Sequence, residues 1–545
     1  MFRSKLNSLI QPLTRNTPDL FTLRTETGAG NSFWRVWRWW APPALITLAL
    51  VFYFVDPFIG DWDGMDYTML SIEGYPSSMA LGRNLFIFSN HLLFVIARAL
   101  FHVRPDSAYL IFKYAVVIQA PLAIVMCWLL ACDISGSLHT ATIAALLIAF
   151  SPVFVLYGGQ VMTDVPSVLV LATALVIHLR GVRQRKLWLI LIGAALLGIG
   201  VNLRETIGFY LPWLILAPFI CGWKLERRTV LYVIASCALF LLLALSWFGY
   251  WYLTDSHYRW VWNGWRESMR DESARHPVTL ANILPYVVYY FISAPLVFVT
   301  ILFAPWMEWR KHRLTPILLL WLVGFGANLL LFFNYSTTVN WRYFLTGLPA
   351  IVPLGAYAML QIAEGRLGDL RRAFKACAGV TVIVAVILFI YMRPISYEFI
   401  ERRAMSRDYK HRLERVPPDA VMISGSQTIA VHYWAAIGDG AWKTIGTGGG
   451  WPGDRLFPTI DNYLSRGRRV FLDTDPRWWL PCGWQRDEIP MIVQLEDHFR
   501  FRRVTETIYE LRPKGDVSAN DDPDLKRLLP ENRPEDTKKC PPVRS

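Results

Sequence analysis

Charged residues are scarce in this chain: Asp, Glu, Lys and Arg make up 18% of its 545 residues, whereas a typical soluble domain has roughly 25%. Apolar residues make up 54%. This balance excludes a disordered or collagen-like protein, because the first lacks large apolar residues and the second repeats glycine at every third position. No internal repeat of fixed period is present either.

Cysteine is also sparse, and its pattern excludes a small disulfide-stapled protein. Seven cysteines are present, and none lies in a Cys-x-x-Cys pair or another metal-ligand spacing. Residues 1–40 are polar and basic and do not resemble a cleavable signal peptide. The net charge is +13, from 55 Lys and Arg against 42 Asp and Glu. Short cytoplasmic loops of membrane proteins collect basic residues, and no nucleic-acid-binding motif is present, so we expect no nucleic-acid partner.

Long apolar runs are abundant in the first 392 residues. Most come close to the ~20 residues that a helix needs to span a bilayer. Twelve candidate runs lie near residues 41–58, 84–101, 107–131, 138–157, 165–180, 187–201, 207–222, 229–253, 282–306, 314–333, 343–361 and 375–392. The sequence therefore predicts an α-helical polytopic protein of the cell (inner or plasma) membrane, with membrane lipids as its neighbours.

Basic clusters predict which loops are cytoplasmic. They lie in residues 1–40 and in the loops at 180–186, 224–228, 310–313 and 366–375. An even number of spans must separate the N-terminal arm from the 180–186 loop, yet five runs lie between them. The run 84–101 holds several polar residues and suits a helix in the membrane interface, within the first outer loop. About eleven spans remain, with the N-terminus cytoplasmic and the C-terminus outside.

Composition divides the chain into four parts. We predict a cytoplasmic basic arm at 1–40, a transmembrane catalytic domain at 41–392, a small extracytoplasmic α/β domain at 393–513 and a disordered tail at 514–545. Short apolar runs such as 420–423 and 469–472 predict strands, and they alternate with helix-like stretches such as 456–467.

Three aspartates lie in the first outer loop, at Asp61, Asp63 and Asp66. They can form a solvated acidic turn or cap a helix. At the membrane boundary, a carboxylate can also act as general base on a substrate whose lipid part stays in the bilayer. Asp63 and Asp66 are three residues apart and would share one face of a helix. Such neighbours raise one another's pKa or share a cation.

The second outer loop places Asp164 two residues before Pro166, at the start of a predicted span. One interpretation is a helix N-cap. The other is a functional acid, because ionisable groups at this depth are costly to bury. Arg204 lies in a short turn between two spans, where the adjacent Glu205 either neutralises it or leaves it for a substrate.

Two further arginines have the same pair of interpretations. Arg342 lies at the outer end of a span beside Tyr343, and Arg83 lies beside Asn84. Each is either an interfacial side chain that reaches the headgroups or a phosphate clamp, since the planar guanidinium binds two phosphate oxygens at once.

The order of these motifs resembles the GT-C superfamily of membrane glycosyltransferases, in particular its protein O-mannosyltransferase-like and lipid A aminoarabinose transferase-like members. Asp63 to Tyr67 resembles their Asp-Glu-x-x-Tyr motif, Ser151 to Pro166 resembles Ser-Pro…Asp-x-Pro, and Trp341 to Pro349 resembles Arg-Tyr…Pro. The resemblance covers roughly residues 40–360. Gly64 stands where many relatives have Glu, which leaves open which of Asp61, Asp63 and Asp66 is the base.

The resemblance implies a hexosyl- or pentosyltransferase that takes a sugar from a polyprenyl-phosphate donor. The acceptor would be a hydroxyl of a glycan, lipid or protein on the outer face of the membrane. The predicted topology agrees, because nucleotide sugars are not available outside the cell. Direct displacement would invert the anomeric configuration. No cofactor is implied with certainty, and the acidic loops permit a divalent cation without requiring one.

The resemblance also implies roles for the candidate residues. Asp63 would be the general base, with Asp61 and Asp66 beside it, and Asp164 would orient the acceptor or assist a cation. A second group would bind substrate and stabilise the leaving phosphate: Arg83, Arg204, Arg342, Tyr67 and Tyr343.

Two other functions share these features. A transporter or flippase of lipid-linked sugars would have a similar number of spans, although the chain lacks the repeated halves and paired interrupted helices that transporters often show. An assembly scaffold with an outer binding domain is the third interpretation.

Overall fold

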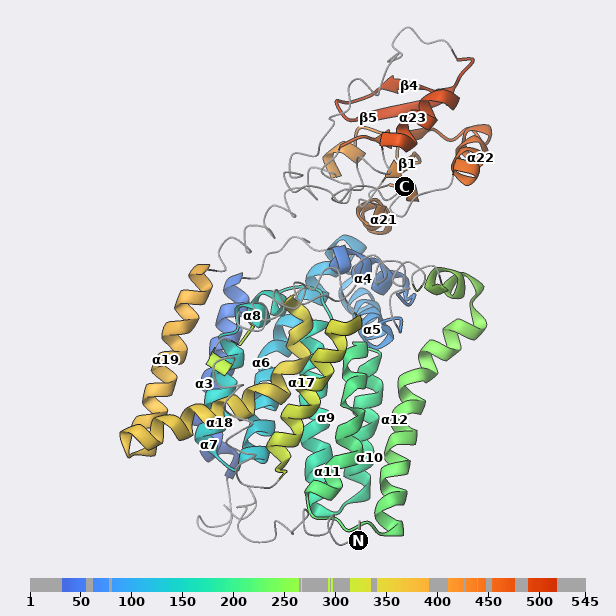
Figure 1. The fold of residues 1–545 in the computed structure, drawn as a ribbon. Coiled ribbons are helices and arrows are strands. Elements are labelled where there is room, and N and C mark those ends of the chain that lie inside the picture. Colours follow the sequence, from blue (N-terminus) through green and yellow to red (C-terminus); the bar gives the residue numbers. More distant parts are fainter. Residues whose placement is uncertain are drawn as a thin grey trace. The chain divides into compact units, whose positions relative to one another are not determined.

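The computed structural model describes most of the chain (Figure 1). The described residues are 32–54, 62–77, 81–263, 266, 293–294, 296–297, 314–334, 341–391, 410–424, 428–438, 440–446, 453–475 and 489–516. Asp61, most of the span predicted at 282–306 and the tail from 517 lie outside them.

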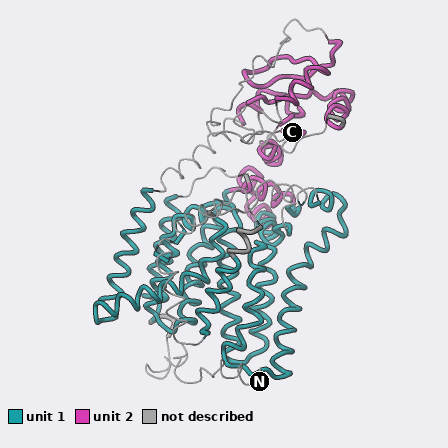
Figure 2. The backbone as a smooth tube through the Cα atoms, in the orientation of Figure 1, with its two compact units in different colours: residues 1–57, 74–95, 110–397 teal, residues 58–73, 96–109, 398–545 magenta. Residues whose placement is uncertain are grey.

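The chain packs as two compact units (Figure 2). Unit 1 comprises residues 1–57, 74–95 and 110–397. Unit 2 comprises residues 58–73, 96–109 and 398–545. Unit 2 therefore combines the C-terminal part of the chain with two short segments of the predicted first outer loop.

Apolar helices make up nearly all of the described part of unit 1. They are α3 (Ser32–Phe54), α5 (Asn84–Phe101), α6 (Ala108–Ser135), α7 (Leu138–Ala149), α8 (Pro152–Gly158), α9 (Asp164–Gln184), α10 (Leu187–Val201), α11 (Leu211–Ile220), α12 (Arg227–Thr254), α17 (Pro316–Asn334), α18 (Leu348–Leu367) and α19 (Leu370–Tyr391). The last turns of α5 and the first residues of α6 extend into unit 2. Short 3-10 helices η2 (Glu205–Tyr210) and η3 (Trp341–Gly347) precede α11 and α18, and η1 (Pro105–Ser107) precedes α6. Each predicted span that the structure describes overlaps one of these helices.

The number of spans is settled only in part. Among the described residues, six helices are long and apolar enough to cross a membrane, or seven if α7 and α8, which meet at 64°, form one bent span. Three shorter apolar helices occur at 187–201, 205–220 and 316–327. The multi-pass helical architecture is thus confirmed, whereas the predicted count of eleven stays a prediction.

Helix α5 is one of the six, although its sequence suggests an interfacial helix. Its contacts in unit 1 run across the ends of other helices. Near its start, Phe88 stacks on Trp251, close to the end of α12, with ring centroids 6.1 Å apart. Two turns later, Phe94 meets Phe112, close to the start of α6. Contacts of this kind fit a helix that lies across helix ends.

Ion pairs show which helix ends lie together in unit 1. The start of α9 meets the residue before η2 through Asp164 and Arg204. The far ends of α6 and α9 meet through Asp133 and Arg180, whose Nε donates to Oδ2 over 2.6 Å. We call the first of these the Asp164 end; it corresponds to the predicted outer side. The other carries the basic 180–186 loop.

Small residues allow close helix contacts in unit 1. A Cβ added at Gly193 of α10 would lie 2.6–2.8 Å from the Cβ, N and Cα atoms of His178 in α9. Helices in membranes associate through such small residues, because lipid gives no hydrophobic driving force between them. Helix α18 ends where Gly368 adopts a φ of +68°, a left-handed stop that glycine tolerates well.

The C-terminal part of unit 2 contains a five-stranded sheet with the order β2-β1-β3-β5-β4. Its strands are β1 (Val421–Ser424), β2 (Lys443–Gly446), β3 (Val470–Asp473), β4 (Phe499–Arg503) and β5 (Ile508–Pro513). β1 pairs parallel with β2 and β3, whereas β5 pairs antiparallel with β3 and β4. Together with α21 (Thr428–Ala436), α22 (Gly453–Ser465) and α23 (Ile489–His498), it confirms the expected α/β architecture.

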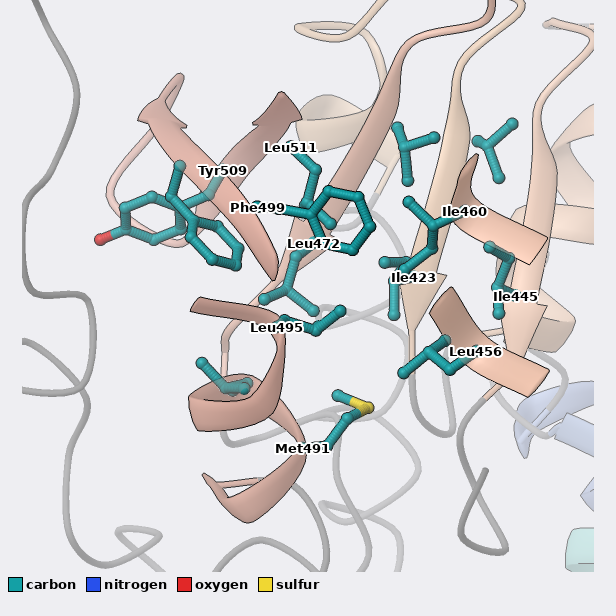
Figure 3. Close-up of a cluster of buried hydrophobic side chains, with 14 residues drawn as sticks. Ile423, Ile445, Leu456, Ile460, Leu472, Met491, Leu495, Phe499, Tyr509 and Leu511 are labelled. Atoms are coloured by element: carbon teal, nitrogen blue, oxygen red, sulfur yellow. The ribbon is translucent and has the colours of Figure 1, made fainter. Parts of the chain in front are cut away.

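Helices α22 and α23 cover one face of this sheet (Figure 3). Alternate strand residues such as Ile423 and Leu472 point to Ile460 and Leu495 in a continuous buried cluster. Side chains on a strand alternate between faces, so Thr444, next to Ile445, points to the other face. Its Oγ1 lies 2.6 Å from His432 Nε2 of α21. Helix α21 therefore covers the second face.

Candidate functional site

A buried ion pair lies at the Asp164 end of unit 1. Arg204 Nη1 donates to Asp164 Oδ1, and the two side chains are only 2% and 1% exposed. The residues come from the start of α9 and the residue before η2, so helix packing joins positions 40 apart in sequence. Two charges taken out of water cost several kcal/mol each unless they are paired, which explains why they are found together.

Two sequence interpretations are wrong at this point. Asp164 is the first residue of α9 and not its N-cap, which is Thr163, and its carboxylate binds Arg204. Glu205 does not pair with its neighbour Arg204: both of its oxygens accept from Arg83. In each case the competing partner is distant in sequence and became available only when the helices packed.

Arg342 and Tyr343 extend this cluster. The Arg204 guanidinium carbon lies 5.0 Å from the centre of the Tyr343 ring, and that of Arg342 lies 5.5 Å from the same ring. The Arg342 carbon also lies 6.0 Å from the Tyr157 ring, and its Nη1 lies 3.7 Å from the Met162 sulfur. Two cations therefore share one aromatic ring, a cation–π arrangement that favours positive charge here.

The motif that carries Arg342 is held by hydrogen bonds to η2. Thr206 Oγ1 lies 3.1 Å from Thr346 Oγ1, and Tyr210 donates its hydroxyl to the Thr346 carbonyl over 2.8 Å. All three residues are buried. These bonds fix η3 against η2, and so fix Arg342 relative to Arg204.

Arg83 approaches the same turn from the start of α5. It donates from Nη1 to the Leu203 carbonyl over 3.3 Å in addition to its pairing with Glu205. Its φ is +50°, a left-handed conformation that costs a residue with a Cβ on the order of 1 kcal/mol. Strain of this kind is maintained by surrounding contacts and often occurs at functional sites.

A second set of bonds holds the turn before Arg83. Tyr75 donates its hydroxyl to Asp255 Oδ2 over 2.9 Å, just beyond the end of α12. Hydrogen bonds from the Tyr258 backbone N–H and the Tyr75 hydroxyl lower the pKa of Asp255. Burial, together with Asp255, raises the pKa of Tyr75 to about 12. At neutral pH, Tyr75 therefore keeps its proton and Asp255 is ionised, so the hydrogen bond between them is maintained.

Five buried polar atoms of the ion pair and of the start of α5, the turn before η2 and the residues after α12 have no hydrogen-bond partner among the described residues. They are Asp164 Oδ2, Arg204 Nε, Asn202 Oδ1, Asn84 Oδ1 and Tyr258 OH. The Asn202 carbonyl accepts from Leu85 N, which connects this group to the start of α5. Such atoms are rare in folded proteins and call for an explanation.

Sequence reasoning missed three of these residues. In the sequence, Asn202 is only a polar residue near Arg204, and Asn84 is only a polar residue in the apolar run 84–101. Tyr258 had no sequence signal, because it comes close to Gly82 and Asn84 only in the fold: a Cβ added at Gly82 would lie 2.8 Å from Asn84 Nδ2 and 3.0 Å from the Tyr258 hydroxyl.

The outer-loop aspartates belong to unit 2. Helix α4 (Trp62–Glu73) contains Asp63, Asp66 and Tyr67, so the expected helical turn is present and the two aspartates share a face. Both aspartates are half-buried and Tyr67 is buried. The structure therefore places Asp164, Arg83, Arg204, Arg342 and Tyr343 together in unit 1. Asp63, Asp66 and Tyr67 lie in unit 2. Asp61 lies outside the described residues.

A divalent cation would need several carboxylate, histidine or cysteine ligands close together. The part of the chain that the structure describes contains no group of three or more His, Cys, Asp and Glu side chains arranged for a metal ion. Asp164 Oδ1 is engaged by Arg204. The described residues alone do not supply a ligand set, and the divalent cation stays a prediction.

The chain is similar to known proteins in sequence over one segment and in fold over most of its length. Residues 87–251 match the family described as dolichyl-phosphate-mannose-protein mannosyltransferase. This segment contains Asp164, Arg204 and Glu205. No curated protein matches the chain in sequence.

Solved structures share the fold at low sequence identity. ArnT from Cupriavidus metallidurans, in a structure bound to undecaprenyl phosphate, is 14% identical with a TM-score of 0.57; the match covers 87% of this chain and 98% of that one. The archaeal oligosaccharyltransferase AglB from Archaeoglobus fulgidus, in complex with an inhibitory peptide and a dolichol-phosphate, is 14% identical with a TM-score of 0.49, over 90% and 75% of the two chains. The family match and the fold shared with ArnT together confirm the resemblance to the GT-C membrane glycosyltransferases.

Proposed function

We propose that the protein is an integral membrane glycosyltransferase that transfers a sugar from a polyprenyl-phosphate donor to an acceptor hydroxyl on the outer face of the membrane. The observation that carries the proposal is the buried Asp164–Arg204 pair, in which Asp164 Oδ2 and Arg204 Nε have no hydrogen-bond partner among the described residues. Burial of such polar groups is costly without a function. A phosphorylated sugar would supply partners for them.

The arginines at the Asp164 end suit a phosphate that leaves with increasing negative charge. Arg83, Arg204 and Arg342 bring three positive charges, against the two carboxylates of Asp164 and Glu205. The group therefore has a net charge of +1, which can stabilise the negative charge of a departing lipid phosphate. Preorganised donors such as these guanidinium groups act strongly where water is excluded, and removing one donor to a developing negative charge typically costs about 10²–10³-fold in rate. The lipid in the ArnT structure is undecaprenyl phosphate, which agrees with this donor class.

Transfer itself requires a base for the acceptor hydroxyl. We assign this role to Asp63, with Asp66 on the same face of α4 as the other candidate, and a positioned base of this kind contributes typically 10²–10⁴-fold. The hydroxyl oxygen attacks the anomeric carbon, its proton passes to the carboxylate, and the bond to the phosphate oxygen breaks. One displacement inverts the anomeric configuration. Asp164, held by Arg204, would orient the acceptor.

A transfer assay tests the proposal. Purified protein in nanodiscs is given radiolabelled polyprenyl-phosphate sugars and a membrane acceptor extract. We expect Asp164→Asn and Asp63→Asn each to lower transfer by about 10²-fold or more. The matched control is Asp133→Asn, which weakens the buried carboxylate pairing with Arg180 at the opposite end of unit 1 and should retain transfer.

Two results would contradict parts of this proposal, and a third decides whether a divalent cation is needed. Normal transfer by Asp63→Asn at wild-type protein levels would exclude Asp63 as the base. Donor binding and movement across the bilayer without turnover would identify a lipid-linked sugar transporter. Unchanged transfer in EDTA, with no gain from Mg²⁺ or Mn²⁺, would exclude a required divalent cation.

A further inference from the structure

Helix α4, which carries Asp63 and Asp66, packs within unit 2 against α21 of the C-terminal sheet (Figure 2). The two helices are more than 350 residues apart in the sequence. The predicted base is therefore attached to a domain for which the sequence indicates no function.

Neither helix is stable by itself. Helix α4 has 12 residues and α21 has nine, and helices shorter than about 12–15 residues are marginal in water. Gly64 lowers the helix propensity of α4 further. Helix α4 therefore depends on packing, and its buried residues Met65, Tyr67 and Leu70 provide an apolar surface for it.

Helix α21 is also anchored to the sheet. It packs on β2, and His432 contacts Thr444 of that strand; its buried residues include Val431, Tyr433 and Trp434. The Tyr433 and Trp434 rings contact one another at 5.0 Å, and the Lys410 ammonium lies 5.1 Å from the Trp434 ring. The sheet thus fixes α21, and α21 offers α4 a rigid surface.

We propose that α21 positions α4, so that the C-terminal domain sets the placement of Asp63 and Asp66. The role of the carboxylates rests on the proposed function, whereas the positioning contact does not. A misplacement of about 1 Å at a reacting group can lower a rate about 10²-fold. Trp434 would then be a positioning residue that acts through α4, and not a catalytic one.

Hydrogen exchange in the full-length protein tests the contact separately from activity. We expect Trp434→Ala to speed exchange in residues 62–73 by about tenfold or more, because local opening follows the loss of packing, while residues 470–473 of β3 stay protected. Trp434→Phe should restore protection. The control Asp461→Ala changes an exposed side chain of α22 and should leave 62–73 unchanged. Unchanged exchange in 62–73 of Trp434→Ala would overturn the proposal.

If Trp434→Ala also speeds exchange in β3, the faster exchange in 62–73 can come from a loosened sheet and not from the lost helix contact. A second variant separates these two causes. Met65→Ala alters α4 and leaves the sheet intact. Faster exchange in residues 428–436 with protected β3 would support the contact, and unchanged exchange there would overturn it.

Steady-state transfer then tests the consequence for the reaction. Trp434→Ala should lower kcat by about 10²-fold with the KM for the lipid-linked donor nearly unchanged, and Trp434→Phe should recover kcat. A rise in KM with unchanged kcat would overturn the positioning role. If the wild-type protein transfers no sugar, the proposed function fails, and the exchange results still decide whether α21 holds α4.

Discussion

The two units contain ion pairs of similar chemistry in different surroundings. In unit 1, Arg204 and Asp164 are 2% and 1% exposed, among apolar helices. In the sheet of unit 2, Arg469 Nε donates to Glu510 over 2.5 Å, but the Arg469 side chain is 49% exposed. Glu510 also has Arg512 as a partner at 3.4 Å. The first pair has no access to solvent, whereas the second is partly hydrated and has a substitute cation.

Surroundings, more than residue type, decide what such a pair does. A half-exposed pair gains little, because water and salt screen it. A fully buried pair costs several kcal/mol per ion in desolvation, so it is a poor way to stabilise a fold. The unit 1 pair therefore points to function and the unit 2 pair to local structure.

The largest effect should follow when the buried pair is broken. Arg204→Met leaves the Asp164 carboxylate buried without its partner, which typically costs about 3–5 kcal/mol of the free energy of unfolding. Equilibrium unfolding in mixed micelles, followed by far-UV circular dichroism, would measure this loss.

A double variant separates stability from function at this pair. Asp164→Asn combined with Arg204→Met removes both charges, and more than half of the lost stability should return while sugar transfer stays absent. If the double variant is no more stable than Arg204→Met, the cost does not come from the unpaired charge.

The second largest effect concerns how helices pack in unit 1. Gly193→Ala introduces a Cβ that would lie 2.7 Å from the His178 backbone nitrogen, and backbone cannot move aside as a side chain can. We expect a loss of about 1–3 kcal/mol, measured in the same unfolding experiment. Gly379→Ala is the matched control in α19, where an added Cβ meets nothing within 4 Å. Equal stability of the two variants would contradict the close contact.

Sequence predicted the helices and strands well because their signals are local. The run at 187–201 has the bounds of α10, and the strand expected at 420–423 is found at 421–424. An apolar run of sufficient length must form a helix in lipid, since unpaired backbone groups are too costly there. The same rule does not say whether α5 crosses the membrane or lies along its surface, because both environments accept an apolar helix.

Partners within the candidate site could not be predicted, because they are distant in sequence. Glu205 is adjacent to Arg204, but the helices bring Asp164 to Arg204 and Arg83 to Glu205. The grouping of α4 with the C-terminal sheet had no sequence signal either. Residue types and loop positions indicated the candidates, and only tertiary packing determined their pairing.

The next effect is a pH dependence of the sheet in unit 2. Burial alone would raise the pKa of Glu510, but the hydrogen bond and charge of Arg469, with Arg512, outweigh it and lower the pKa below its ordinary value of 4.5. A lowered pKa in the folded state adds stability that is full above pH 4.5 and is lost as the pH falls through the folded value. Thermal unfolding of the full chain between pH 7 and 3 should show this loss, and Glu510→Gln should reduce it.

The smallest effect should come from the exposed partner of that pair. Arg469→Ala removes one cation from Glu510, but Arg512 remains at 3.4 Å and Arg502 at 4.0 Å. Because Arg469 is half exposed, we expect a loss of about 0.2–1 kcal/mol, and this loss should shrink in 0.5 M salt. Sugar transfer should not change. A loss as large as that of Arg204→Met would show that the two pairs differ less than their exposure indicates, and the functional interpretation of the buried pair would lose its main support.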